Sequence, residues 1–316
     1  MKIVLALFLV AFSLFGANVK MPDSSFKAGG GVTDIVYKDS KLYIATDVGL
    51  VDIFDVKSKE IIQKIKAPKI KDFMGEYVDA KIYSVDVFEE KILLLSQGSK
   101  GYSELYLYEN KKLTKIISTS DELSIAKAKF INECSVLLGL LGNDIISYNI
   151  KTKEINWKKQ ASQSKFSDFV LNESKTEVVI ADESGTLHLF EVKNGKLIKT
   201  LSGQNLDNVF AVDYKNKTIA TAGQDRRAVI YDLRLDSAYY KMSGFLIYGV
   251  GLSPSAKLAA FASDEKNNVS VFKTDSKSII AVFGGNKMTV SKILFISENE
   301  FFVASDDRVV NFYKIK

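Results

Sequence analysis

The chain is poor in the residues that metal, redox and cofactor sites most often use. Its 316 residues include one cysteine, one histidine and one tryptophan. The single cysteine, Cys134, excludes an internal disulfide and dithiol chemistry, and the single histidine, His188, excludes a histidine-rich zinc site. The chain also has no Cys-x-x-Cys-His motif, which argues against covalent haem attachment. We therefore expect no enzyme activity, no cofactor and no metal.

The remaining reactive residues have ordinary structural interpretations. Cys134 is flanked by apolar residues of a predicted strand, which indicates a small buried side chain and not a nucleophile. His188 also lies in a predicted strand, where a structural role is favoured. Asp306 and Asp307 could contribute to a hard-cation site, but paired acids at a hairpin tip are usually solvated turn residues.

The N-terminus has the layout of a secretory signal peptide. Lys2 gives a positive start, and Ile3 to Phe15 form an apolar run broken only by Ser13. This run has roughly 13 residues, whereas a permanent membrane helix needs ~20. Small residues at positions 16 and 17 follow, so we predict a signal peptide over residues 1–17 and a mature domain over 18–316, with an uncleaved anchor as the alternative.

Compartment follows from the same features. No cysteine lies near the junction, which excludes a bacterial lipid anchor, and no second stretch has membrane-spanning length. Large periplasmic domains can do without the disulfides that small secreted domains need. We therefore predict a periplasmic protein without a permanent membrane anchor after processing.

The charge of the chain is modest and spread along the sequence. The formal net charge is +5, and nearly all the cations are lysines. Nucleic-acid binders concentrate their basic residues with stacking aromatics, so this dispersed excess predicts a solvated surface and no nucleic-acid partner. Three of the four arginines, Arg226, Arg227 and Arg234, are the exception, because they lie within nine residues.

A strand that ends in an aromatic residue recurs along the chain. The seven aromatics are Phe54, Tyr108, Tyr148, Phe190, Tyr231, Phe272 and Tyr313, with spacings of 54, 40, 42, 41, 41 and 41. This period is that of a four-stranded propeller blade, and the single long interval predicts an extended loop over 66–81. The residue three before each aromatic is always apolar and the one two before is mixed, so we expect strands with one consistently buried side.

Two units carry a sharper pattern. Residues 219–233 and 179–203 are similar to the WD-repeat family, which implies a ring of blades that binds other proteins. The Gly-His dipeptide of that family is missing, and Trp157 is not at a Trp-Asp position, so the usual hydrogen-bonded tetrad is not expected. The lone tryptophan also cannot provide the repeated docking motifs of quinone-carrying propellers.

The two ends of the chain complete one blade. The last unit has three predicted strands, 290–296, 301–305 and 309–315, and then the chain ends. Ser24 to Ala28, followed by three glycines, matches the outer strand and turn of other units. We therefore predict an all-β, seven-bladed β-propeller in which an N-terminal strand closes the last blade.

Candidate partner-binding residues fall in one loop and two turns. Aromatic and methionine side chains in a loop favour recognition, and arginines can bind a partner's carboxylates by forked hydrogen bonds or can brace their own turns against neighbouring acids. We favour bracing for the Asp-Arg turns. The candidates are Lys69, Lys71, Phe73, Met74 and Tyr77 in the predicted loop, and Arg226, Arg227 and Arg308 in the turns.

These features together predict a protein-interaction scaffold that is monomeric on its own. The overall layout resembles WD-repeat-like accessory proteins of periplasmic nitrate reductase systems, which implies a role in assembly of, or electron supply to, that enzyme. Two alternatives remain open at this point: a scaffold for envelope assembly, and a propeller enzyme of the lactonase or quinoprotein type.

Overall fold

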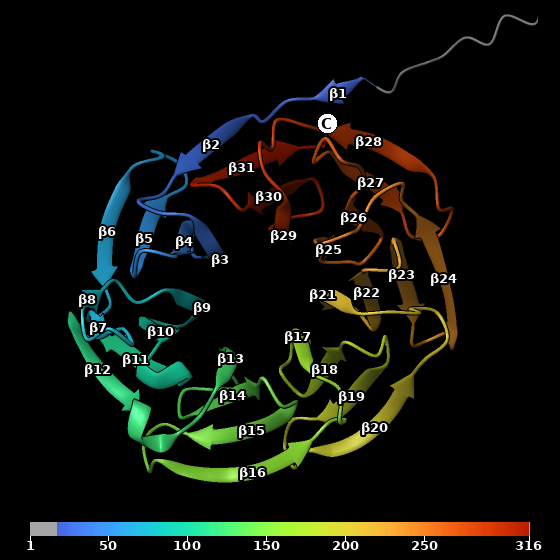
Figure 1. The fold of residues 1–316 in the computed structure, drawn as a ribbon. Helices are drawn as coiled ribbons and strands as arrows, with labels where there is room; N and C mark the ends of the chain where they lie inside the picture. The colour runs from blue at the N-terminus through green and yellow to red at the C-terminus, as the bar shows by residue number, and fades with distance from the viewer. Residues whose placement is uncertain (1–17, 316) are drawn as a thin grey trace, which may run out of the picture.

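Strands cover most of the computed structural model, which describes residues 18–315. They form six antiparallel sheets of four strands and one sheet of five strands, arranged around a central axis (Figure 1). The chain is therefore a seven-bladed β-propeller, as predicted. The proposed signal peptide lies outside the described residues. Among the residues described, no helix is long and apolar enough to cross a membrane.

Each blade runs from the axis outward through strands that we call a, b, c and d. The a strands are β3 (Val32–Lys38), β9 (Ile82–Phe88), β13 (Ile125–Phe130), β17 (Phe166–Leu171), β21 (Val209–Lys215), β25 (Val250–Leu252) and β29 (Val290–Phe295), which begin blades 1 to 7 in that order. The b strands are β4 (Lys41–Thr46), β10 (Lys91–Gln97), β14 (Ser135–Leu140), β18 (Glu177–Asp182), β22 (Thr218–Gly223), β26 (Leu258–Ala262) and β30 (Glu300–Ser305).

The recurrent aromatics all lie in the c strands, which confirms the predicted alignment of the units. The c strands are β5 (Leu50–Asp55), β11 (Ser103–Glu109), β15 (Asp144–Asn149), β19 (Leu187–Glu191), β23 (Arg227–Asp232), β27 (Val269–Lys273) and β31 (Val309–Lys314). The d strands are β6 (Ile61–Lys66), β12 (Lys112–Ile117), β16 (Glu154–Gln160), β20 (Lys196–Leu201), β24 (Ser237–Met242), β28 (Ile279–Phe283) and, from the N-terminus, β2 (Ser24–Lys27). Two short 3-10 turns, η1 (Ser99–Gly101) and η2 (Thr119–Asp121), complete the elements of the ring.

The N-terminal segment closes the ring as predicted. Strand β2 pairs antiparallel with β31, in a register that joins Ser24 to Phe312 and Lys27 to Val309. A further strand, β1 (Val19–Lys20), pairs parallel with β28 and adds a fifth strand to blade 6. Figure 1 shows both strands lying beside the C-terminal blades. The first residues of the described chain therefore hold blades 6 and 7 together.

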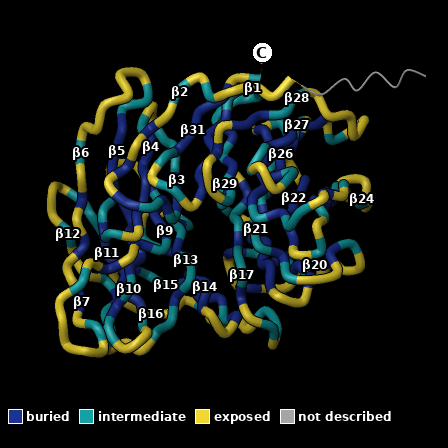
Figure 2. Tube along the Cα trace, turned by 45° about the horizontal axis from the view of Figure 1, so that its top comes forward, coloured by how far each residue is buried: buried dark blue, intermediate teal, exposed yellow. Residues whose placement is uncertain are grey.

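The residue three before each recurrent aromatic is buried, as expected, and the other side of the c strands is covered as well. Positions between the apolar ones in the c strands, such as Asp52, Ser270 and Asn311, are buried too. Each blade packs against a neighbour on both of its faces, so both sides of the b and c strands are covered, and exposure is confined largely to turns and outer strands (Figure 2). Six of the seven mixed positions, polar and apolar alike, are therefore buried between blades, and His188 is half-buried.

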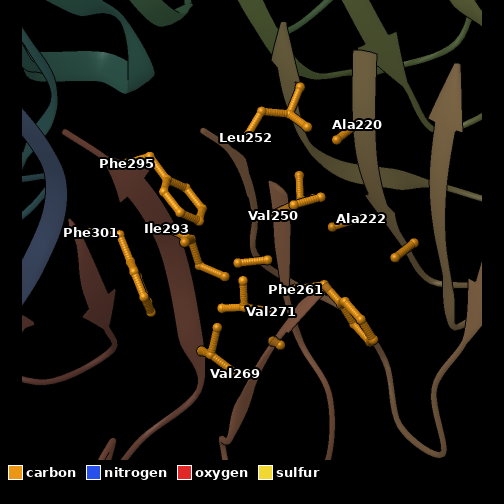
Figure 3. Close-up of a cluster of buried hydrophobic side chains, with 14 of the residues drawn as sticks. Ala220, Ala222, Val250, Leu252, Phe261, Val269, Val271, Ile293, Phe295 and Phe301 are labelled. Carbon is orange, nitrogen blue, oxygen red and sulfur yellow. The ribbon is translucent and has the colours of Figure 1, made fainter. Parts of the chain in front are cut away.

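Apolar packing is continuous from blade to blade. Figure 3 shows part of a cluster that spans blades 5 to 7, in which Ala220 and Ala222 lie beside Val250 and Leu252, with Ile293 beyond them. Small alanine side chains on β22 let the next blade approach closely, and larger side chains on β25 and β29 fill the space. Each junction therefore depends on both of its blades.

Buried polar side chains join two of the blades to the connections that precede them. In blade 5 the Asn205 side chain accepts a hydrogen bond from the Thr221 hydroxyl at 2.7 Å and donates one to the Tyr231 hydroxyl at 3.0 Å. In blade 7 the Tyr313 hydroxyl donates to the side chain of Asn286 at 3.2 Å. In both blades, a hydrogen bond thus joins an asparagine in the preceding connection to a tyrosine in the c strand.

The alternating turns define two faces of the ring. Because successive strands are antiparallel, a–b and c–d turns lie at one end of each sheet, whereas b–c turns and the connections to the next blade lie at the other. We call these ends the c–d face and the b–c face.

Candidate functional site

The longest connection between blades folds into a small hairpin on the b–c face. It lies between β6 and β9, where the sequence predicts the extended loop, and pairs β7 (Ile70–Lys71) with β8 (Tyr77–Val78). Ile70 is buried at its base, and the Lys66 ammonium lies 2.9 Å from the Asp79 carboxylate. The Ser99 hydroxyl also donates to the Lys71 carbonyl at 3.3 Å. The hairpin is thus attached to blades 1 and 2.

One carboxylate orders the tip of this hairpin. An oxygen of Asp72 accepts hydrogen bonds from the backbone N–H groups of Met74 and Glu76, both at 2.9 Å. Gly75 between them has a φ of 86°, a left-handed conformation that glycine adopts at little cost. The tip therefore has a defined conformation before any partner binds.

The side chains of the tip point into solvent. Phe73 is 96% exposed, Met74 72% and Tyr77 65%. The Lys71 ammonium lies 5.3 Å from the centroid of the Tyr77 ring, and Lys69 is exposed beside them. Large apolar side chains at such exposure contribute little to the fold and are typical of recognition surfaces.

The Asp-Arg turns are braced by their aspartates, not by the expected arginine pairs. Asp225 accepts backbone hydrogen bonds from Leu206 at 2.8 Å and Arg227 at 3.0 Å. The guanidinium that folds back is that of Arg227, which donates to the Gln204 carbonyl at 2.7 Å. Among residues 18–315, the side chains of Arg226 and Arg308 make no ion pair, and both residues are exposed. The predicted pairing of Arg226 and Arg308 with neighbouring acids is therefore wrong, because the aspartate carboxylates of these turns accept backbone N–H groups instead.

Arg227 has a structural position of its own. Its guanidinium carbon lies 4.1 Å from the centroid of the Tyr240 ring, and its Nε atom lies 3.9 Å from Asp225. These contacts occupy the charged group within blade 5. Arg227 is thus the candidate least available to a partner.

All eight candidate residues lie on the b–c face, but not in one patch. The hairpin lies between blades 1 and 2, Arg308 is in the b–c turn of blade 7, and Arg226 and Arg227 are at that of blade 5. Figure 1 shows blade 5 across the ring from the hairpin. The hairpin is therefore a self-contained candidate site, to which the arginines do not contribute.

The central channel contains charged groups that the sequence reasoning missed. Four a-strand aspartates each accept a backbone N–H from the next blade: Asp34 from Val85, Asp86 from Phe130, Asp168 from Val212 and Asp213 from Leu252, at 2.7 to 3.1 Å. The channel that they line has a volume of about 610 Å³. An alignment of the a strands with one another could have revealed charged residues in the channel. In four of these strands the residue just after a β-bulge is charged: Asp34, Lys127, Asp168 and Lys292.

Asp34 is the hub of this network. Its carboxylate contacts the ammonium groups of Lys129, at 2.9 Å, and Lys292. Burial alone would raise the pKa of Asp34, but the attraction of these two lysines outweighs it and holds the pKa well below its usual range. A single carboxylate thus links blades 7, 1, 2 and 3, and the paired charges serve to hold the ring together.

The remaining reactive residues lie apart from the hairpin. His188 is half-buried, with its Nε2 atom 4.0 Å from Asp182, and burial lowers its pKa. Cys134 is not the buried strand residue that we expected, because it lies in the a–b turn of blade 3, partly exposed. Within the part of the chain that the structure describes, no three His, Cys, Asp or Glu residues are grouped so that they could hold a metal.

Comparison with known proteins adds no family. Neither a protein-family model nor a curated protein sequence matches this chain. What the structure establishes is the seven-bladed propeller.

Proposed function

We propose that this protein is a non-catalytic interaction scaffold and that the β7–β8 hairpin is its docking element. The observation that carries the proposal is Phe73, which is 96% exposed on a turn that the Asp72 carboxylate holds in place. An aromatic side chain presented on an ordered turn loses little conformational entropy on binding, so most of its burial contributes to affinity.

The chemistry of the tip suggests the form of its partner. A concave apolar pocket would take Phe73, with Met74 and Tyr77 at its edge. Lys69 and Lys71 would face carboxylates at the rim of that pocket, where charge mainly sets orientation and association rate.

The compartment and the partner class rest on the sequence. The signal-peptide pattern of residues 1–17 supports a periplasmic protein, and the overall layout resembles NapL, the accessory protein of periplasmic nitrate reductase systems. We therefore propose that the partner is a component of a periplasmic nitrate reductase system, which this protein supports without itself carrying a redox centre.

Affinity capture from periplasmic extract tests the docking element. A variant with Phe73→Ala and Tyr77→Ala should lose capture of the partner, and one with Lys69→Glu and Lys71→Glu should weaken it. Arg226→Ala, on the same face but across the ring, is the matched control and should capture as the wild type does. Equal capture by all of these variants would exclude the hairpin as the docking element.

A deletion strain tests the partner class separately. Loss of the protein should lower periplasmic nitrate reductase activity, and the wild-type gene should restore it while the Phe73→Ala, Tyr77→Ala variant should not. Unchanged activity would remove the nitrate reductase assignment and leave the scaffold proposal standing. Stoichiometric calcium or quinone in the purified protein would contradict both.

A further inference from the structure

The lysines that are dispersed in the sequence gather on the outside of the ring. The six c–d turns carry eight cations, Lys57, Lys59, Lys111, Lys151, Lys153, Lys193, Arg234 and Lys277, and three acids, Glu60, Asp236 and Asp275. The d strands that follow these turns add nine lysines and one acid, Glu154. Since the net charge of the whole chain is only +5, the rest of the molecule is acidic overall.

The b–c face, in contrast, carries more acidic than basic residues in its turns. Its seven b–c turns carry the four cations Lys100, Arg226, Lys266 and Arg308, against the seven acids Asp47, Glu183, Asp225, Asp264, Glu265, Asp306 and Asp307. On the c–d face itself, the a–b turns nearer the axis carry six acids and three lysines. The positive charge is therefore confined to the outer rim of one face, which we call the lysine rim and define by the c–d turns and the first residues of the d strands.

Four of these lysines occupy turn positions that favour other residues. Lys59, Lys111, Lys153 and Lys277 have φ angles of 60 to 64°, in the left-handed region where glycine and asparagine are most comfortable. Blade 4 has Gly195 at the corresponding place, with the same backbone hydrogen bond to the residue four before it as at Lys59, Lys153 and Lys277. Backbone conformation does not explain lysine in these positions.

Most of these lysines are also free to contact a ligand; the exception is Lys277, whose ammonium lies 4.4 Å from the centroid of the Tyr239 ring. Of the seven lysines in the c–d turns, only Lys151 has a carboxylate within 4 Å among residues 18–315. Five of the d-strand lysines, in contrast, form ion pairs: Lys64, Lys66, Lys115 and Lys158 with acids at 2.7 to 3.6 Å, and Lys199 with Asp236 of the next blade. A larger share of the turn lysines than of the d-strand lysines is therefore uncompensated.

Exposed aliphatic side chains follow the lysines in blade after blade. They begin the d strands just past the turns: Ile61, Ile62, Ile155, Leu197, Ile198, Ile279 and Ile280, which are 37 to 52% exposed. Lysine beside exposed isoleucine and leucine is typical of surfaces that lie on a membrane. Protein interfaces are depleted in lysine and enriched in aromatic residues, methionine and arginine. The hairpin tip, with Phe73, Met74 and Tyr77, has the aromatic residues and the methionine of such an interface.

We propose that the lysine rim binds the surface of an anionic lipid bilayer, reversibly and without a permanent anchor. The turn lysines contact the headgroups, and the aliphatic residues beside them reach the headgroup boundary. The hairpin lies on the opposite face, so the ring binds lipid with its docking element directed away from the membrane. The proposal does not depend on the identity of the hairpin's partner.

Vesicle co-sedimentation of the purified protein tests the proposal. The wild type should bind vesicles with about 30% phosphatidylglycerol in phosphatidylcholine, should bind pure phosphatidylcholine weakly, and should be released by salt. In the rim variant, Lys59, Lys111, Lys153 and Lys277 are each replaced by asparagine, which removes four charges and suits the backbone of all four turns. Binding to the anionic vesicles should fall about a hundredfold or more.

A control variant removes four charges from the b–c face. Lys81→Gln, Lys100→Asn, Lys266→Gln and Lys287→Gln give the same net charge as the rim variant, and Lys100 also has a positive φ. Binding of this variant should stay within about threefold of the wild type, because charges on the far face lie beyond the screening length. Equal losses in both variants, or no preference for anionic vesicles in the wild type, would overturn the proposal. Binding of polyglutamate without binding of vesicles would also overturn it and assign the rim to an acidic protein.

Discussion

Replacing Phe26 tests whether the N-terminal strand is a structural part of the ring. Phe26 is the central residue of β2 and is 1% exposed. Its ring lies 5.5 Å from that of Phe54 in blade 1 and 5.7 Å from that of Phe302 in blade 7, both in edge-to-face geometry. Phe26→Ala keeps the backbone pairing of β2 with β31 and removes only this packing.

The expected cost is large. Truncating a buried phenylalanine to alanine costs about 3 to 5 kcal/mol, since transfer and cavity terms add. Phe26 packs on two aromatic rings from adjoining blades, so we expect about 4 kcal/mol, and with a urea slope of about 3 kcal/mol/M the midpoint should fall by about 1.3 M.

Urea unfolding followed by two signals measures this effect. Circular dichroism reports all the blades, whereas fluorescence of Trp157, the only tryptophan, reports β16 in blade 3, far from the closure. Both midpoints should shift together if opening the ring unfolds the whole domain. Phe73→Ala is the matched control, because that side chain is 96% exposed and its loss should change the unfolding free energy by less than about 0.5 kcal/mol.

A pair of deletions extends the test. Removing Ser24 to Ala28 should abolish the stable fold or cause aggregation by exposing the edge of β31. Removing residues 72–76 from the hairpin tip should be mild, because loop length enters the closure entropy only weakly. If the two deletions are equally tolerated, or if Phe26→Ala and Phe73→Ala have the same midpoint, the closure account is refuted.

Further predictions concern the channel, the thiol and processing. Asp34→Asn leaves Lys129 and Lys292 without their shared carboxylate and should lower the unfolding free energy by about 3 kcal/mol, measured by urea titration at pH 7. The pKa of Asp34 is depressed in the folded state, so its stabilising contribution should be complete above about pH 4 and be lost as the pH falls below that value, giving a decline that is smaller in the Asn variant. Cys134→Ser, in a partly exposed turn, should change the unfolding free energy by less than about 1 kcal/mol, and a larger loss would show packing that the structure does not contain. Mass spectrometry of the native protein should find an N-terminus close to Asn18, and retention of Met1 would contradict the signal-peptide prediction.

Spacing along the chain was sufficient to predict the ring. The repeated aromatic, of which Tyr231 is one, identifies the c strands because every blade places an apolar aromatic at the same point of the same packed strand. Closure of the ring by Ser24 to Ala28 could be predicted because the last unit has three predicted strands and a blade needs four. The long interval before Tyr108 likewise located the connection that forms the hairpin.

Contacts between distant residues could not be predicted in the same way. Lys292 and Asp34 are 258 residues apart, and each is an ordinary charged residue in its own strand. The prediction for the Asp-Arg turns failed for a related reason. A partner of the Asp225 carboxylate is the backbone N–H of Leu206, which lies 19 residues earlier in the chain.

The lysine rim could be recognised from the sequence only after the blades had been assigned. Lysines spread evenly along a chain look like a solvated surface when the chain is read in one dimension. Once each blade is known to have four strands, every c–d turn falls on the same face, and an even spacing becomes a ring of charge.

The most direct test of the scaffold proposal is a photo-crosslinking amino acid placed at position 73. In cells that express the protein, irradiation should give one dominant crosslinked product with a single partner protein, because Phe73 is the centre of the proposed contact. The same crosslinker at Leu235, which is 75% exposed in a c–d turn on the opposite face, should not give that product. Absence of a product at position 73, or the same products from both positions, would contradict the proposal that this hairpin is the docking element.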